Sequence, residues 1–111
     1  MTRHELALVL PGDPLTPGVV VPCRPVGVLN MEDEAGGDAK LLAVPINKVL
    51  PMYSRWQRPE DVNAMRLNAI RHFFEHYKDL EPGKWVKVQG WDGPDAAREE
   101  VRVGMENWRK A

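Results

Sequence analysis

Four carboxylates lie within seven residues of one another in the segment Met31–Lys40, which also contains a Gly-Gly pair. The acidic residues are Glu32, Asp33, Glu34 and Asp38. Neighbouring carboxylates repel each other by about 1 kcal/mol in water and roughly 4 kcal/mol in a partly buried site, so a cation normally accompanies them. Carboxylate oxygens are hard ligands that suit Mg²⁺, Mn²⁺ or Ca²⁺. The pattern predicts either a metal site formed by Asp33 and Asp38 or a solvated acidic hairpin.

A second group of polar side chains lies in the segment His72–Asp79. His72 and His76 are four residues apart, so on a helix they share one face, as two zinc ligands would. The sequence offers no obvious third ligand, and a polar or interface pair is the simpler interpretation. Tyr77 and Lys78 follow with a phenol and an ammonium group, both of which can hold a phosphate oxygen.

Composition and charge restrict the class of protein. The chain has 111 residues, with 15 Lys and Arg against 16 Asp and Glu, which predicts a single domain over residues 1–111. A net charge of −1 argues against binding of nucleic acid through a basic surface. The apolar run Leu6–Leu10 is too short to span a bilayer, and the N-terminus lacks the pattern of a signal peptide. With Cys23 as the single cysteine, we expect a cytoplasmic protein without disulfides or membrane contact.

Short strands and two helices must position these polar segments. Short apolar runs between Pro and Gly turns predict strands at Leu6–Leu10, Val19–Val21, Val26–Leu29, Leu41–Ile46 and Trp85–Gln89. One of the turns is Pro11–Pro14. Apolar residues at helical spacing from Val62 to Leu80 predict a helix that is capped by Asp61, and a second helix begins at Pro94. These elements predict an α+β domain, mainly β, with a small barrel or curled sheet.

Taken together, the segments resemble the soluble family I inorganic pyrophosphatases of bacterial type. Cys23–Leu29 resembles the strand that enters the family's acidic loop, and Met31–Lys40 resembles its Met-x-Asp-Glu-Ala-Gly-x-Asp-x-Lys loop. His72–Val88 resembles the following helix and strand. The resemblance covers about residues 15–110 and implies an OB-like β-barrel with two flanking helices. It also implies Mg²⁺-dependent hydrolysis of diphosphate to two phosphates.

The resemblance also implies roles for individual residues. They are the Mg²⁺ ligands Asp33 and Asp38, the phosphate-binding residues Lys40, Tyr77 and Lys78, and the supporting residues Arg24 and Glu34. In bacterial members of the family the helix that contains His72, His76 and Asp79 forms subunit contacts. We therefore expect a homo-oligomer, with diphosphate and phosphate as the small-molecule partners.

The sequence departs from the family's pattern at its beginning. The family's strongest signature is an Asp-x-Asp-Pro-x-Asp motif, whose aspartates hold the activating metals and include the general base. An ungapped alignment places its three aspartates at Met1, Arg3 and Leu6, none of which is a carboxylate. The resemblance therefore lacks the N-terminal third of a family chain and leaves the catalytic residues unassigned.

Two functional interpretations follow from this combination. The first is an inorganic diphosphatase. The alternative is a truncated, catalytically impaired relative that binds metal, phosphate or a full-length partner without turnover. A third interpretation, an OB-like module for single-stranded nucleic acid, requires basic residues interleaved with exposed aromatic residues. The sequence shows no such face.

Overall fold

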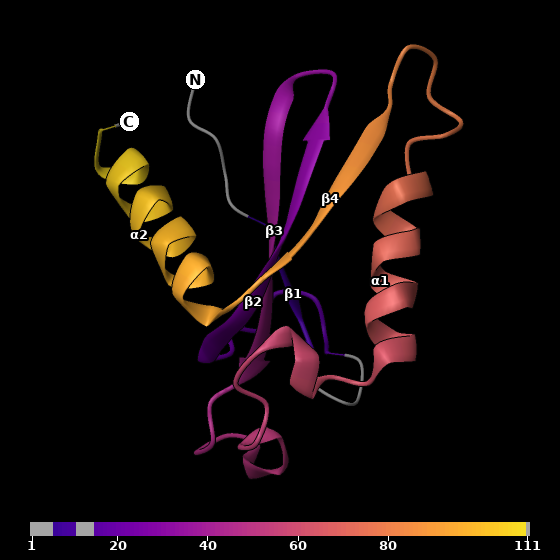
Figure 1. Cartoon of the computed structure of the whole chain (residues 1–111). Helices are drawn as coiled ribbons and strands as arrows, with labels where there is room; N and C mark the ends of the chain where they lie inside the picture. Colours follow the sequence, from indigo (N-terminus) through magenta and orange to yellow (C-terminus); the bar gives the residue numbers. More distant parts are fainter. Residues whose placement is uncertain (1–5, 11–14, 111) are drawn as a thin grey trace.

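Two long antiparallel strands form the centre of the molecule and contain the acidic segment (Figure 1). The computed structural model describes residues 6–10 and 15–110. Its strands are β1 (Leu6–Val9), β2 (Cys23–Asp33), β3 (Gly36–Pro45) and β4 (Val86–Asp92). Its helices are the short 3-10 helices η1 (Pro51–Tyr53) and η2 (Pro59–Asp61) and the α-helices α1 (Ala64–His76) and α2 (Pro94–Lys110).

The four described strands form one mixed sheet in the order β1-β3-β2-β4. Strand β1 is parallel to β3, whereas β2 is antiparallel to both of its neighbours. The described strands do not close into a ring, and α1 and α2 lie on opposite sides of them (Figure 1). The prediction of an incomplete OB-like barrel with two flanking helices is therefore confirmed.

Apolar side chains are buried on both faces of the sheet. One cluster consists of Leu10, Val26, Leu42, Val44, Tyr53 and Val62. The second cluster consists of Val28 and Leu41 packed on Ala97 of α2. Because successive strand residues point to opposite faces, the neighbours Leu41 and Leu42 enter different clusters. Strands β2 and β3 are therefore clamped from both sides, which holds the acidic segment on a rigid support.

A bulge in β2 brings its backbone close to η2. The register of β2 on β3 shifts between Pro25 and Gly27, as expected where a proline without an N–H group lies in a central strand. A Cβ atom built on Gly27 would lie 2.3 Å from Cγ of Pro59 and 2.9 Å from the backbone oxygen of Asp92. Only glycine allows this close approach of the two segments.

Helix α1 is shorter than the sequence pattern predicts. Its N-cap is Asn63, whose side chain accepts a hydrogen bond of 2.8 Å from the backbone N–H of Met65. The prediction that Asp61 caps this helix is wrong. The Asp61 carboxylate instead accepts the N–H groups of Gln57 and Arg58 and closes η2.

The apolar face of α1 is only partly covered by the described residues. Ile70 packs against the first core cluster, whereas Met65 and Phe73 are exposed. A groove of about 420 Å³ runs between β1 and α1, and its lining is apolar apart from Arg66. The periodicity correctly predicted a helix in this region, but it did not predict how much of the apolar face is buried.

The strand prediction succeeded where a partner strand is present. Val19–Val21 forms no strand in the structure, and Val20 is 93% exposed, so that prediction is wrong. Strands β2 and β3 are longer than predicted because their pairing continues through the acidic residues.

Helix α2 begins at Pro94, as predicted. The predicted turn at Pro11–Pro14 lies outside the described residues, and no described helix has the length and apolar character needed to cross a membrane.

Replacing Gly27 by alanine is expected to destabilise the fold, because the new methyl group would collide with Pro59 and with backbone of β4. We expect a loss of about 1–3 kcal/mol in the free energy of unfolding, measured by urea denaturation. Gly37→Ala is the matched control, because a Cβ atom there has no neighbour within 4 Å. Equal stability of the two variants would contradict the packing of η2 against β2.

Candidate metal and phosphate site

A two-residue turn at the end of the β2–β3 hairpin fixes the geometry of the acidic segment. Glu34 and Ala35 form the turn. The Asp33 Oδ1 atom accepts a hydrogen bond of 2.9 Å from the backbone N–H of Ala35. Gly36 follows with a φ of 116°, a conformation that other residues rarely adopt. The Asp side chain and the glycine therefore specify the turn locally.

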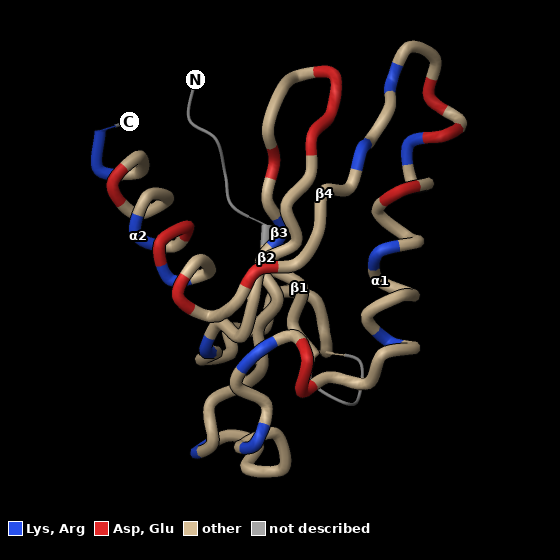
Figure 2. The backbone as a smooth tube through the Cα atoms, viewed as in Figure 1, with Lys and Arg blue, Asp and Glu red and all other residues tan. Residues whose placement is uncertain are grey.

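The register of the hairpin places three of the predicted site residues on one face of the sheet. Asp33 pairs with Gly36, Met31 with Asp38, and Leu29 with Lys40. Because side chains alternate along a strand, Asp33, Asp38 and Lys40 point to the same side. Asp33 and Asp38 are diagonal neighbours, for which a separation of roughly 7–8 Å is typical. Figure 2 shows the acidic residues gathered at this end of the hairpin.

Lys40 forms a largely buried ion pair with Asp38. Its Nζ atom lies 2.8 Å from Oδ2 of Asp38, and the two side chains are 8% and 14% exposed. The same ammonium lies 5.9 Å from the centre of the Phe74 ring on α1, within range of a cation–π contact. A lysine that is this deeply buried needs a carboxylate partner, because an unpaired buried charge is strongly destabilising.

Lys78 joins the acidic turn from the segment that follows α1. Its Nζ atom donates a hydrogen bond of 3.1 Å to Oδ2 of Asp33 and lies 3.5 Å from Oε1 of Glu34. The second carboxylate oxygen of Glu34 accepts the backbone N–H of Trp85 at 3.4 Å. The segment between α1 and β4 is therefore attached to the hairpin turn at two points.

These contacts shift the pKa of two of the groups in the expected directions. The pKa of Glu34 is lowered, chiefly by a hydrogen bond from its own backbone N–H and further by the N–H of Trp85 and the charge of Lys78. The pKa of Lys78 is raised, chiefly by its hydrogen bond to Asp33. Both shifts favour the charged forms, so the turn holds an ion-paired cluster at neutral pH.

Tyr77 places a phenol beside this cluster. It forms the C-cap of α1 and is 42% exposed. Its ring stacks on Phe73 with a centroid separation of 5.7 Å, and Nζ of Lys78 lies 5.6 Å from its centre. The structure therefore brings together five of the predicted residues at one end of the hairpin, namely Asp33, Glu34, Asp38, Lys40 and Lys78, with Tyr77 adjacent.

Arg24 does not join this group. It lies nine residues before Asp33 on β2, roughly 30 Å of extended chain away. Its guanidinium donates hydrogen bonds to the backbone oxygens of Trp56 at 2.5 Å and Tyr53 at 2.6 Å. Arg24 thus ties β2 to the loop around η1, far from the acidic turn.

His72, His76 and Asp79 lie near the end of α1. The two histidine rings are 4.4 Å apart, and Nδ1 of His76 lies 2.8 Å from Oδ2 of Asp79. The side chains of His76 and Asp79 are more than half exposed. Their contacts within the described part of the chain are with each other, which agrees with a surface position.

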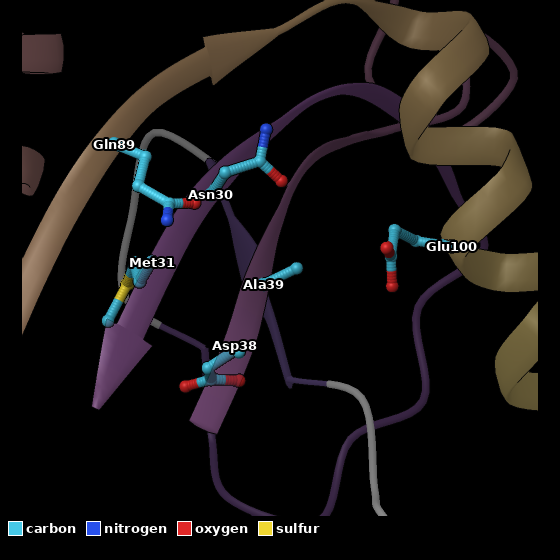
Figure 3. A pocket seen from close by; sticks show the side chains of 7 residues that line it. Asn30, Met31, Asp38, Ala39, Gln89 and Glu100 are labelled. Carbon is cyan, nitrogen blue, oxygen red and sulfur yellow. The ribbon is translucent and has the colours of Figure 1, made fainter. Parts of the chain in front are cut away.

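Glu100 of α2 lies beside the hairpin, although nothing in the sequence links it to the acidic segment. A hollow of about 230 Å³ lies between the hairpin and α2, and both Asp38 and Glu100 line it (Figure 3). Asn30 and Gln89 add amide groups to the lining (Figure 3). The Asp38 carboxylate pairs with Lys40, whose ammonium faces Phe74 of α1, whereas Glu100 lies on α2, which packs against the other face of the sheet. Glu100 was missed because α2 brings it to the hairpin only through tertiary packing.

The oxygen atoms of the acidic side chains are the type of ligand that a hard divalent cation prefers. Asp33 and Asp38 present carboxylate oxygens from one face of the sheet. Mg²⁺ is commonly bound through one or two carboxylates, with phosphate oxygens and waters completing its octahedron. Within residues 6–10 and 15–110, no group of three or more His, Cys, Asp or Glu side chains is placed to hold a metal. Among the described residues, the carboxylates of Asp33 and Asp38 on their shared face are the candidates for such a small ligand set.

Comparison with known proteins identifies the family. The family model for inorganic pyrophosphatase matches residues 6–109. The chain belongs to this family. Its sequence is 52% identical over 103 residues to the inorganic pyrophosphatase of Pseudomonas aeruginosa and 50% identical over 103 residues to that of Aquifex pyrophilus.

Solved structures of the family share the fold described above. The inorganic pyrophosphatase of Helicobacter pylori superposes with a TM-score of 0.88 at 46% identity, covering 93% of this chain and 61% of that one. The enzyme of Thermus thermophilus gives a TM-score of 0.85 at 48% identity, covering 93% and 59%. The chain also spans 59% of the length of the Pseudomonas aeruginosa relative and 58% of the Aquifex pyrophilus relative, with 93% of its own length matched.

The Lys78 contact predicts a measurable pKa change at Glu34. In Lys78→Met the pKa of Glu34 is expected to rise, because one cation is lost, but to stay below its ordinary value, because both backbone N–H groups remain. A carbon-detected NMR titration of the Glu34 carboxyl measures this pKa. Lys84→Met is the control, since Lys84 pairs with Glu81 instead.

The sign of the linked stability follows from the lowered pKa. The folded state favours the carboxylate of Glu34, so its contribution is complete above the ordinary glutamate pKa and is lost as the pH falls through the folded value. If the Glu34 titration is unchanged in Lys78→Met, the contact between Lys78 and the turn is absent in solution.

Proposed function

We propose that this chain acts as an inorganic diphosphatase, which hydrolyses diphosphate to two phosphates with Mg²⁺. One observation carries the proposal: two carboxylates and two ammonium groups share one end of a rigid hairpin, in a chain that belongs to the inorganic pyrophosphatase family. Carboxylates bind the cation, and ammonium groups neutralise phosphate oxygens. The combination suits a small ligand made of metal and phosphate.

Asp33 and Asp38 are the proposed metal-binding residues. Their support from the sheet fixes the spacing of the two carboxylates before any ligand arrives, which reduces the entropy lost on binding. When bound, Mg²⁺ supplies a positive charge that polarises the phosphoryl group and an attacking water. Asp33 and Asp38 would hold the cation through their carboxylate oxygens, on the face of the sheet that they share.

Lys40, Tyr77 and Lys78 are the proposed phosphate-binding residues. An ammonium donates up to three hydrogen bonds and neutralises the charge that develops on a leaving phosphate. Lys40 is held in place by Asp38 and the Phe74 ring, so it is positioned in advance. The phenol of Tyr77 adds a neutral donor at the same end of α1.

Glu34 and Arg24 are proposed to act by positioning other residues. Glu34 is proposed to orient Lys78 and to fix the start of β4 through the N–H of Trp85. Arg24 is proposed to support the opposite end of β2 by its hydrogen bonds to the η1 loop, and so acts on the hairpin as a whole.

A homo-oligomer that forms through α1 is also proposed. Supporting observations are the exposed apolar side chains Met65 and Phe73 and the half-exposed pair His76 and Asp79 on or beside this helix. We further propose a cytoplasmic location, since a reducing compartment keeps the free thiol of Cys23 reduced.

Phosphate release from diphosphate tests the proposed function. The purified chain is expected to release phosphate only when Mg²⁺ is present. Asp38→Asn is expected to reduce the rate by at least about 10–100-fold, the loss typical when a residue that supports a metal ligand is replaced. Glu32→Gln is the matched control. Like Asp38→Asn it removes one negative charge from the hairpin, but the Glu32 side chain points to the face opposite Asp33 and Asp38.

Two results would contradict the proposal. Absence of release from folded protein at every Mg²⁺ concentration would exclude hydrolysis by this chain. Equal rates for the unaltered chain and Asp38→Asn would exclude Asp38 as a metal-binding residue. Circular dichroism of each variant establishes that the fold is retained.

A further inference from the structure

We propose that Asp33 and Glu34 hold Lys78 as an internal counter-ion in the metal-free chain, and that a divalent cation on Asp33 releases Lys78 to bind phosphate. The inference rests on the proposed function, because it concerns the regulation of the same site. It makes the order of binding a property of the protein: cation first, then phosphate.

The contacts of Lys78 show which partners its ammonium must leave in order to bind phosphate. Its ammonium lies 3.1 Å from Oδ2 of Asp33 and 3.5 Å from Oε1 of Glu34. The side chains of Lys78 and Asp33 are 15% and 11% exposed. A phosphate therefore meets an ammonium that is already neutralised by two carboxylates and shielded from solvent. The same ammonium cannot neutralise the phosphate fully while it serves both carboxylates.

A cation on Asp33 would disrupt this arrangement. Oδ1 of Asp33 accepts the N–H of Ala35 and Oδ2 accepts the ammonium of Lys78, so a cation that bound at Oδ2 would compete directly with Lys78. A divalent charge bound to the same carboxylate would repel the ammonium, because like charges at such short range interact strongly at a partly buried site. The flexible four-carbon stem of lysine allows the ammonium to swing toward an incoming anion.

Lys40 differs from Lys78 in the element that holds it. Lys40 lies within β3, in the paired part of the hairpin, and its ammonium faces the Phe74 ring. Lys78 lies beyond the end of α1, in a turn. The structure therefore contains one fixed ammonium and one that is positioned to exchange, so the coupling between metal and phosphate is expected to pass through Lys78.

A purely structural role for Lys78 makes a different prediction. If Lys78 only braces the segment between α1 and β4 against the hairpin, removal of its partner carboxylate loosens that segment and leaves phosphate affinity unchanged or weaker. If Lys78 is an internal counter-ion, removal of the carboxylate strengthens phosphate binding in the absence of metal. The sign of the change separates the two roles.

Calorimetric titration of inorganic phosphate into the chain, with a chelator present, tests the inference. Asp33→Asn retains the acceptor for Ala35 but loses the charge, and it is expected to bind phosphate about three- to fivefold more tightly than the unaltered chain. Glu32→Gln, the control on the opposite face of β2, should change the affinity by less than about twofold. In the double variant Asp33→Asn/Lys78→Met the gain should disappear.

Equal or weaker phosphate binding by folded Asp33→Asn would overturn the inference, and so would a gain that persists without Lys78. If Asp33→Asn does not fold, Glu34→Gln provides the second test, with a smaller gain expected and no gain overturning the inference. An NMR shift of the Lys78 side chain on addition of Mg²⁺, with Lys84 unaffected, would support it, whereas an unchanged Lys78 signal would oppose it.

The two proposals fail in different ways. Tighter phosphate binding by Asp33→Asn, together with no release of phosphate from diphosphate by the unaltered chain, would overturn the hydrolytic function and retain the counter-ion exchange. Mg²⁺-dependent release together with unchanged phosphate affinity in Asp33→Asn would retain the function and overturn the exchange.

Discussion

Asp33 and Gly36 close the β2–β3 hairpin around two residues, and this closure determines which side chains share a face of the sheet. Because side chains alternate along a strand, a slip of one residue would turn Asp38 and Lys40 toward α2 and expose Leu41 on the other side. The alternation of the two core clusters opposes such a slip. The positions of the charged groups thus follow from the same register that buries the apolar ones.

The charge distribution at the hairpin turn reflects a compromise between binding and stability. Two carboxylates that are suited to a cation repel each other when the cation is absent, and the chain offsets this repulsion with lysines from β3 and from the segment after α1. The same lysines suit a phosphate. The proposed site therefore contains its own balancing charges, because its carboxylates pair with lysines of the same chain.

Local patterns predicted the parts of this arrangement that depend on neighbours in sequence. The acidic loop, its glycine and the start of α2 at Pro94 could be found in this way. Val19–Val21 has strand composition but no partner strand among the described residues. The position of Glu100 beside the hairpin and the separation of Arg24 from the acidic turn depend on tertiary packing and strand length. No spacing rule encodes either of them.

The ion pair between Asp33 and Lys78 joins residues 45 positions apart, so its two halves are not synthesised together. At elongation rates of about 5–20 residues per second, the acidic turn precedes its lysine by roughly 2–9 s. During that interval the hairpin has its own register but lacks this counter-ion. The carboxylates of the acidic turn then repel each other without the offset that Lys78 later provides.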